Sequence, residues 1–134
     1  MKRIITITII AIVVVATTVA AIKFFINMNK FTSLNASDFE QAITDDQVII
    51  VDVRTAEEYS GGHIHNAINI DVKRAGFLYE ADEKLPKDKT IAVYCQGGVR
   101  SRKAAVLLAD NGYTVINLSG GISEWMAAGK KTEQ

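Results

Sequence analysis

The chain has 134 residues, of which 49% are hydrophobic, and its fifteen basic and fifteen acidic side chains give a net charge of zero. Every acidic residue lies after position 37, so the segment from residue 31 carries eleven basic against fifteen acidic side chains and a net charge of −4. A segment with this negative net charge lacks the basic surface that is typical of a nucleic-acid-binding protein. Its length of about one hundred residues suits one domain with one core.

The first expected element is an apolar helix at the N-terminus. Residues 4–22 contain no charged side chain, and this run has about the length that a helix needs to cross the hydrocarbon core of a bilayer. Lys2 and Arg3 precede it, which is typical of a signal anchor or of a cleavable signal peptide. The small residues of Val19-Ala20-Ala21 suit a signal peptidase, but the apolar run continues beyond them and favours an uncleaved anchor.

Residues 1–30 are therefore interpreted as a membrane anchor or signal segment, and residues 31–134 as one folded domain. The charges that flank the apolar run are slightly more positive before it than after it, which favours a cytoplasmic N-terminus. We expect a single-pass protein of the cell membrane whose domain lies outside the cytoplasm, and a cleaved, exported protein is the alternative. The single cysteine, Cys95, excludes an intramolecular disulfide and an N-terminal lipoprotein anchor.

The domain alternates short helices with short strands. Ser37-Asp38-Phe39-Glu40 fits a capping box that opens a helix to about Ile43. Apolar, mainly β-branched runs predict strands, and amphipathic segments bounded by Gly or Pro predict helices. The expected strands are 48–51, 67–70, 91–94 and 114–118; the further helices are 56–59, 77–85, one from Ser101, and a last one that carries Trp125. This alternation predicts an α/β domain with a mostly parallel central sheet flanked by helices.

The loop that begins at Cys95 reads Cys-Gln-Gly-Gly-Val-Arg and lies between an expected buried strand and the helix expected from Ser101. Ligands of such sheets bind beyond the carboxyl ends of the strands. Adjacent glycines allow successive N–H groups to point inward as an anion-binding nest, and the helix adds its positive end. A thiol held there is driven toward the thiolate. A core cysteine, the alternative, belongs inside the strand, so Cys95 is interpreted as a nucleophile.

These segments together resemble the rhodanese family of sulfurtransferases over nearly all of residues 34–129. The residues that carry the resemblance form three signatures in the family's order. They are Asp52-Val53-Arg54 with Glu58-Tyr59, Gly62-His63-Ile64 and Ala67-Ile68-Asn69-Ile70; the loop Cys95 to Arg100 with Ser101; and Leu118-x-Gly120-Gly121 with Trp125. The resemblance implies a rhodanese-like fold behind one transmembrane helix.

The resemblance also implies an enzyme that moves sulfane sulfur from a donor such as thiosulfate to a thiol or cyanide acceptor, through a persulfide on Cys95. The residues that it assigns to the site fall into two groups. The substrate-binding loop is Gln96, Gly97, Gly98, Val99 and Arg100, and the supporting residues are Asp52, Arg54 and Ser101. Arg100 either positions an anionic donor or braces the loop through a salt bridge. The implied partners are the small donor, the thiol acceptor and the membrane, with no cofactor, and a protein partner is left open.

Two other functions are weighed against the sulfurtransferase. Related phosphatases separate their cysteine and arginine by five residues, whereas four lie between Cys95 and Arg100, so a phosphatase is disfavoured. A non-enzymatic module that carries or senses sulfane sulfur, or docks a membrane partner, is the alternative of another class. Inactive family members usually lack the cysteine, so its presence favours the enzyme.

Three further side chains are expected to serve structure. His63 is expected to hydrogen-bond locally, and Trp125 to anchor the last helix in the core. His65 stands where the family commonly has a small residue, which places the geometry of that turn in question. Neither histidine has the partners or the spacing of a metal site, so none is expected.

Overall fold

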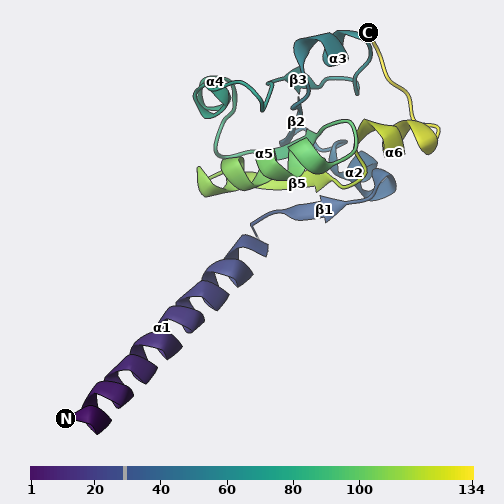
Figure 1. The fold of residues 1–134 in the computed structure, drawn as a ribbon. Helices are drawn as coiled ribbons and strands as arrows, with labels where there is room; N and C mark the ends of the chain where they lie inside the picture. Colours follow the sequence, from purple (N-terminus) through teal and green to yellow (C-terminus); the bar gives the residue numbers. More distant parts are fainter. Residues whose placement is uncertain (29) are drawn as a thin grey trace.

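The computed structural model describes residues 1–28 and 30–134. A long N-terminal helix, α1 (Lys2–Met28), precedes a domain in which five short strands alternate with five helices (Figure 1). In chain order the elements of the domain are β1 (Thr32–Leu34), α2 (Ala36–Ala42), β2 (Val48–Asp52), α3 (Ala56–Ser60), β3 (Ile68–Asn69), α4 (Phe77–Lys84), β4 (Thr90–Tyr94), α5 (Val99–Asp110), β5 (Thr114–Leu118) and α6 (Gly121–Ala127).

The strands form one sheet in the order β1-β5-β4-β2-β3, and every neighbouring pair is parallel. The predicted α/β domain with a parallel sheet is thereby confirmed. Strands β2, β4 and β5 are rich in Val and Ile, as parallel strands covered on both faces are. Because all strands run the same way, their carboxyl ends share one edge of the sheet, and Asp52 at the end of β2 lies opposite Tyr94 at the end of β4.

Helices cover both faces of the sheet. Helices α4 and α5 pack on one face, where Val51, Val93 and Cys95 point, and α2 and α6 pack on the other, where Ile50 and Tyr94 point. Successive side chains of a strand alternate between the two faces, so Tyr94 and Cys95 point to opposite sides. The thiol therefore lies on the same side of the sheet as α5.

The structure differs from the sequence-based expectations at three places. Strand β1 was not predicted, because three residues of sequence Thr-Ser-Leu carry little periodicity. The predicted capping box at Ser37 is wrong: Asn35 caps α2, and its side chain accepts the N–H of Asp38 at 2.8 Å. Helix α5 begins at Val99, two residues before the predicted start at Ser101, because Gly98 serves as its N-cap.

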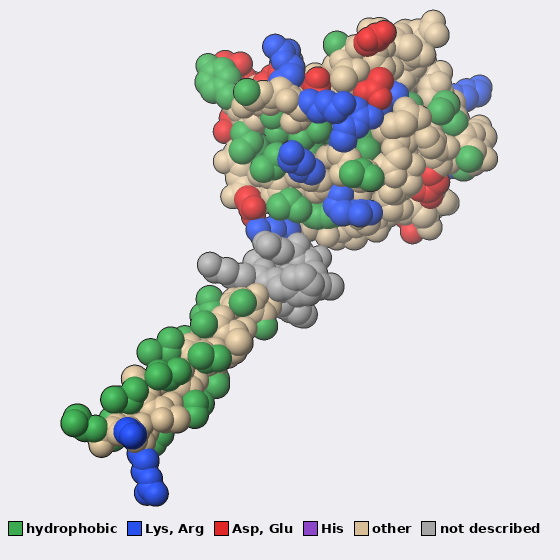
Figure 2. All heavy atoms as spheres, viewed as in Figure 1, with side chains coloured by type: hydrophobic (Ala, Val, Ile, Leu, Met, Phe, Trp, Pro, Cys, Tyr) green, Lys and Arg blue, Asp and Glu red, His purple; other side chains and the backbone are tan. Residues whose placement is uncertain are grey.

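Helix α1 contains a 21-residue stretch, Lys2–Ile22, that is long and apolar enough to cross a membrane. The stretch has the length and composition of a membrane span, and an N-terminal signal sequence has the same properties. None of the stretch is buried against the domain (Figure 2). The domain therefore has a complete core without this helix.

Candidate active site

The candidate site is the loop that joins β4 to α5 at the carboxyl edge of the sheet. Cys95 follows β4 directly and is 1% exposed, so its sulfur lies beneath the loop. The Gly98 N–H donates a hydrogen bond to Cys95 Sγ at 3.1 Å, which closes the loop around the thiol. The chain thus turns back over the Cys95 thiol before it enters α5.

The conformation of this loop depends on Gly98. Its φ of 105° lies in the region that L side chains rarely adopt, and a Cβ placed there would lie 2.1 Å from the carbonyl oxygen of Ser119. A glycine is therefore required both for the turn and for the close approach of the chain that follows β5. At the neighbouring Gly97, by contrast, no heavy atom lies within 4 Å of an added Cβ.

The start of α6 supports the loop from the other side. The N–H of Ile122 donates to the carbonyl of Cys95 at 2.9 Å, and the N–H of Ser123 donates to that of Gln96 at 3.1 Å. Gly121, with φ 65°, makes this contact possible, because a Cβ there would lie 2.4 Å from the Gln96 carbonyl oxygen. Since these carbonyls are bonded to α6, the N–H groups of the loop are free to point toward the sulfur.

A buried ion pair between Asp52 and Arg54 holds the side chain of Gln96 in place. Arg54 Nη2 lies 2.7 Å from Asp52 Oδ2, and both side chains are almost completely buried. The same guanidinium donates to the Gln96 side-chain oxygen at 3.2 Å and to the Gly62 carbonyl at 2.7 Å. The Gln96 amide then donates to the Ser123 hydroxyl at 2.9 Å. The structure therefore places Asp52 and Arg54 next to the loop, with their polar groups engaged in support.

Arg100 makes a bidentate salt bridge with Glu58. Its Nη1 and Nη2 donate to the two carboxylate oxygens at 2.7 and 2.8 Å. Glu58 is itself fixed, because it forms a capping box with Thr55 at the start of α3. The pKa of the Glu58 carboxyl is lowered to about 2, chiefly by its hydrogen bonds with Arg100. This geometry is the bracing alternative foreseen for Arg100.

The surroundings of the thiol favour its ionised form. Burial by itself raises the pKa of Cys95, but hydrogen bonds from the Ser101 hydroxyl and from the N–H groups of Ser101, Gly98 and Gly97 outweigh burial and lower it. Ser101 is fully buried at the start of α5, and its hydroxyl also lies 3.2 Å from the Gly98 carbonyl. A thiolate at this position would be stabilised chiefly by these fixed donors, with a further favourable charge interaction from the Arg100 guanidinium.

The remaining predictions about side chains concern the periphery of the site. His63 Nδ1 lies 2.9 Å from the Tyr59 carbonyl oxygen, which confirms its local hydrogen bond. Trp125 is 4% exposed and packs edge-on against Phe39, which confirms it as a core anchor. His65 pairs with Glu133 near the C-terminus at 2.5 Å.

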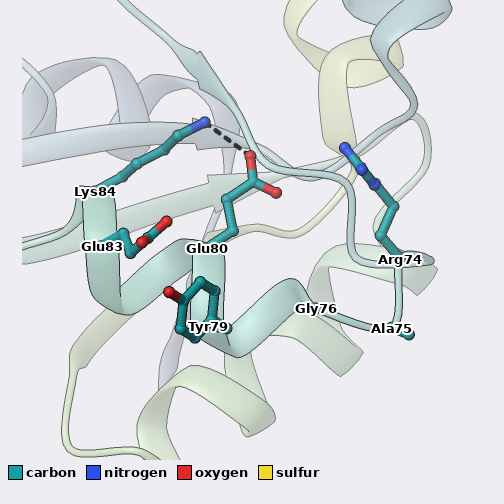
Figure 3. Close-up of a pocket in the computed structure, with 7 residues that line it drawn as sticks. All are labelled: Arg74, Ala75, Gly76, Tyr79, Glu80, Glu83 and Lys84. Carbon is teal, nitrogen blue, oxygen red and sulfur yellow. Dashed lines mark hydrogen bonds and ion pairs between the residues drawn. The ribbon is translucent and has the colours of Figure 1, made fainter.

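The other features that could hold a ligand lie away from the loop. Figure 3 shows a hollow at the start of α4, lined by Arg74, Tyr79 and Glu80 among others, in which Lys84 pairs with Glu80. It contains no cysteine or histidine. Within residues 1–28 and 30–134, no three His, Cys, Asp or Glu side chains are placed to hold a metal ion. The loop around Cys95 therefore stays the best candidate for chemistry.

The sequence matches the family of the Rhodanese-like domain over residues 35–128. The chain belongs to this family. Its domain also resembles the crystal structure of a rhodanese-related protein from Thermoplasma volcanium, with a TM-score of 0.68 and 33% identity over 77% of this chain and 98% of that one. The predicted fold and family are thereby confirmed.

Curated relatives include proteins of two kinds. The chain is 42% identical over 77 residues to the uncharacterized protein YqhL of Bacillus subtilis, which covers 57% of this chain and 59% of that protein. It is 35% identical over 104 residues to the tRNA uridine(34) hydroxylase of Hamiltonella defensa, which covers 75% of this chain and 29% of the hydroxylase. The rhodanese-like chain thus spans less than a third of the hydroxylase it matches.

Sequence reasoning did not identify every residue that shapes the rhodanese-like loop. It gave no role to Glu58, although the spacing Thr55-x-x-Glu58 is that of a capping box and fixes this carboxylate in place. It also missed the N–H groups of Ile122 and Ser123, for which the Gly120-Gly121 pair is the sequence signal. Both supports act over long separations in sequence.

Proposed function

We propose that the protein is a sulfurtransferase that carries sulfane sulfur on Cys95. The observation that supports this function best is the buried thiol whose sulfur accepts the Gly98 N–H at 3.1 Å and whose pKa is lowered by the loop. A thiolate at the focus of several N–H donors is a nucleophile whose product, another sulfur anion, would be held by the same donors.

The proposed reaction consists of two displacements. In the first, the Cys95 thiolate attacks the outer sulfur of thiosulfate, a new S–S bond forms, and the S–S bond of thiosulfate breaks as sulfite leaves with the electron pair. In the second, cyanide or a thiolate attacks the outer sulfur of the Cys95 persulfide. The S–S bond to Cys95 breaks as the Cys95 thiolate leaves with the electron pair, and thiocyanate or a new persulfide is released. The total charge is the same before and after each step.

The residues of the loop and its supports would have different roles in this reaction. The N–H groups of Gly97, Gly98 and the start of α5 would hold the negative outer sulfur. Four residues between Cys95 and Arg100 make a ring suited to one sulfur atom rather than to a phosphate. Arg100 would brace the ring through Glu58, and the Asp52–Arg54 pair would hold Gln96 in place.

We further propose that α1 anchors the enzyme in the cell membrane by a single pass. The supporting observation is a continuous exposed apolar helix that begins beside Lys2 and Arg3. The charges around the helix favour a domain outside the cytoplasm, and cleavage with export remains the competing outcome. The activity of the tRNA uridine(34) hydroxylases is not carried over, because the chain spans only 29% of the one compared.

Intact-protein mass spectrometry tests the function directly. Full-length protein in non-ionic detergent should gain one sulfur, about 32 Da, on incubation with thiosulfate, and should lose it when cyanide is added. The variant Cys95→Ser should gain nothing. Continuous release of thiocyanate with both substrates present would distinguish an enzyme from a carrier that is loaded once. Absence of the adduct on the wild-type protein would refute the proposal.

A further inference from the structure

The outer face of α5 carries a continuous stripe that begins at the catalytic loop. Val99, Arg102, Lys103 and Val106 recur at the spacing that places residues on one side of a helix. Val99 is 80% exposed, Arg102 and Lys103 are exposed, and Val106 is half-buried. The opposite side of the helix, with Ser101 and Ala104, is buried against the sheet. We refer to these four residues as the α5 stripe.

The stripe is positively charged although the domain is acidic. Among the described residues, neither Arg102 nor Lys103 has an acidic side chain within salt-bridge distance, whereas Arg100 is paired with Glu58. The acidic residue of α5, Asp110, lies at the far end of the helix and is paired with Lys30. In Figure 2, Lys and Arg side chains gather over the face that α5 covers, and Asp and Glu lie mainly at its margins. Two free cations therefore stand beside the mouth of the site.

An apolar side chain accompanies these cations at the loop itself. Val99 is the most exposed large hydrophobic residue in the described part of the domain, and it lies within the loop that encloses Cys95. An exposed valine beside two unpaired cations can serve as a small protein-binding patch, in which Val99 makes a non-polar contact at the loop and the charges fix orientation.

The end of the α5 stripe at Val99 lies away from the N-terminal helix. Strand β1 follows α1 closely, and because the sheet is parallel its start lies at the amino edge, whereas Cys95 lies at the carboxyl edge. Figure 1 shows α1 leaving the domain near the end of α5 that lies farther from the loop. A helix of 12 residues separates the two ends by about 18 Å. If α1 spans a membrane, a partner would approach the stripe from the aqueous side.

We propose that the α5 stripe docks an acidic segment of a soluble protein that exchanges sulfur with Cys95 through a cysteine of its own. This inference rests on the proposed sulfurtransferase function. Carboxylates of the partner would pair with Arg102 and Lys103, while an apolar residue next to its cysteine would contact Val99. The partner's thiolate attacks the outer persulfide sulfur, the S–S bond to Cys95 breaks, and the partner leaves with the persulfide. A nucleic acid fits less well, because two free cations on a domain of net charge −4 offer few phosphate contacts.

The test uses full-length protein that has been loaded with sulfur and checked by mass. Three acceptor peptides of equal length carry one cysteine flanked by three Glu, three Gln or three Lys. The rate of transfer to each peptide is compared between the wild type and the variant Arg102→Glu/Lys103→Glu. Each comparison is made on one peptide at a time, because flanking charges also change the pKa of the peptide's own thiol. The matched control, Lys89→Glu/Lys131→Glu, makes the same change in net charge outside the α5 stripe.

The charge reversal should slow transfer to the Glu peptide about tenfold at low ionic strength, and the loss should shrink at 0.5 M salt. It should speed transfer to the Lys peptide and leave discharge by cyanide unchanged. An equal loss in the control variant, or no change on the Glu peptide, would overturn the docking inference while loading and cyanide discharge still support the sulfurtransferase. A single-stranded RNA that competes with the Glu peptide on the wild type and not on the variant would assign the stripe to nucleic acid instead.

Discussion

Replacement of Gly98 by alanine is the sharpest test of how the loop activates the thiol. The backbone at φ 105° would become strained, which costs about 1–3 kcal/mol for a residue with a side chain. The new Cβ would also lie 2.1 Å from the Ser119 carbonyl oxygen, and relief of such overpacking costs about 1–3 kcal/mol more. We therefore expect Gly98→Ala to lower the free energy of unfolding by about 2–6 kcal/mol. The displaced loop would lose the 3.1 Å hydrogen bond to Cys95, so the pKa of the thiol should rise.

The stability of the Gly98→Ala variant and the pKa of its Cys95 thiol can both be measured on the same protein. Urea unfolding can be read from the fluorescence of Trp125, the single tryptophan of the chain, and alkylation by iodoacetamide against pH gives the pKa of Cys95. Sulfur transfer should fall about 10²-fold, as it does when one donor to a developing anion is lost. Gly97→Ala is the matched control, because nothing lies within 4 Å of its added Cβ, and it should leave stability and the pKa nearly unchanged. Equal effects of the two substitutions would refute the reasoning.

Two further predictions concern the brace and the anchor. The ionised form of Glu58, with its pKa lowered to about 2, stabilises the fold above about pH 4.5 and loses this effect as the pH falls toward 2. Glu58→Gln should therefore cost about 1 kcal/mol at pH 7, and urea titrations should show the difference from wild type shrinking below pH 4.5; a difference undiminished at pH 2.5 would contradict this. Full-length protein should stay with membranes after carbonate washing because of α1, and external protease should reach its C-terminus. A soluble product that starts near Ala21 would instead indicate cleavage.

The strands were predictable wherever burial on both faces imposed a run of branched apolar residues. Strand β4 could be recognised from Ile91 to Tyr94 because it lies between two other strands and carries only Ile, Ala, Val and Tyr after Thr90. Strand β1 lies at the edge of the sheet, where three residues are enough for pairing with β5, and so few residues impose no pattern. The apolar pattern of a sequence thus indicates which strands are buried, and it does not identify a strand whose burial is incomplete.

Helix boundaries failed for a different reason, because several residues near each boundary can cap a helix. Asn35 and Ser37 are both good N-caps, and the choice between them was made by the core, which buries Ala36 and Phe39 on one side of α2. At α5, the helix was expected from Ser101, but Ser101 is a buried residue of the first turn. The left-handed Gly98 ends the loop earlier than any side-chain preference indicates.

The sequence was sufficient to predict the Cys95 loop, but not the side-chain contacts that hold this loop in place. The order of strand, cysteine, glycines and helix located Cys95 and its N–H donors, because these features are local in sequence. The partner of Arg100 is Glu58, 42 residues away, and the support of Gln96 comes from Arg54 at the same separation. Such contacts depend on which strands become neighbours, and that arrangement is a property of the assembled sheet.

The burial of a single cysteine has a consequence for damage by oxidants. A disulfide requires two Cα atoms within about 7 Å of each other, and a sulfur that is 1% exposed beneath its own loop does not allow a second copy to approach so closely. Hydrogen peroxide that reached the thiolate would convert it to a sulfenic acid. The chain has no other thiol to resolve that acid. Reduction must therefore come from outside the chain, and without a reductant further peroxide would oxidise Cys95 irreversibly to the sulfinic acid.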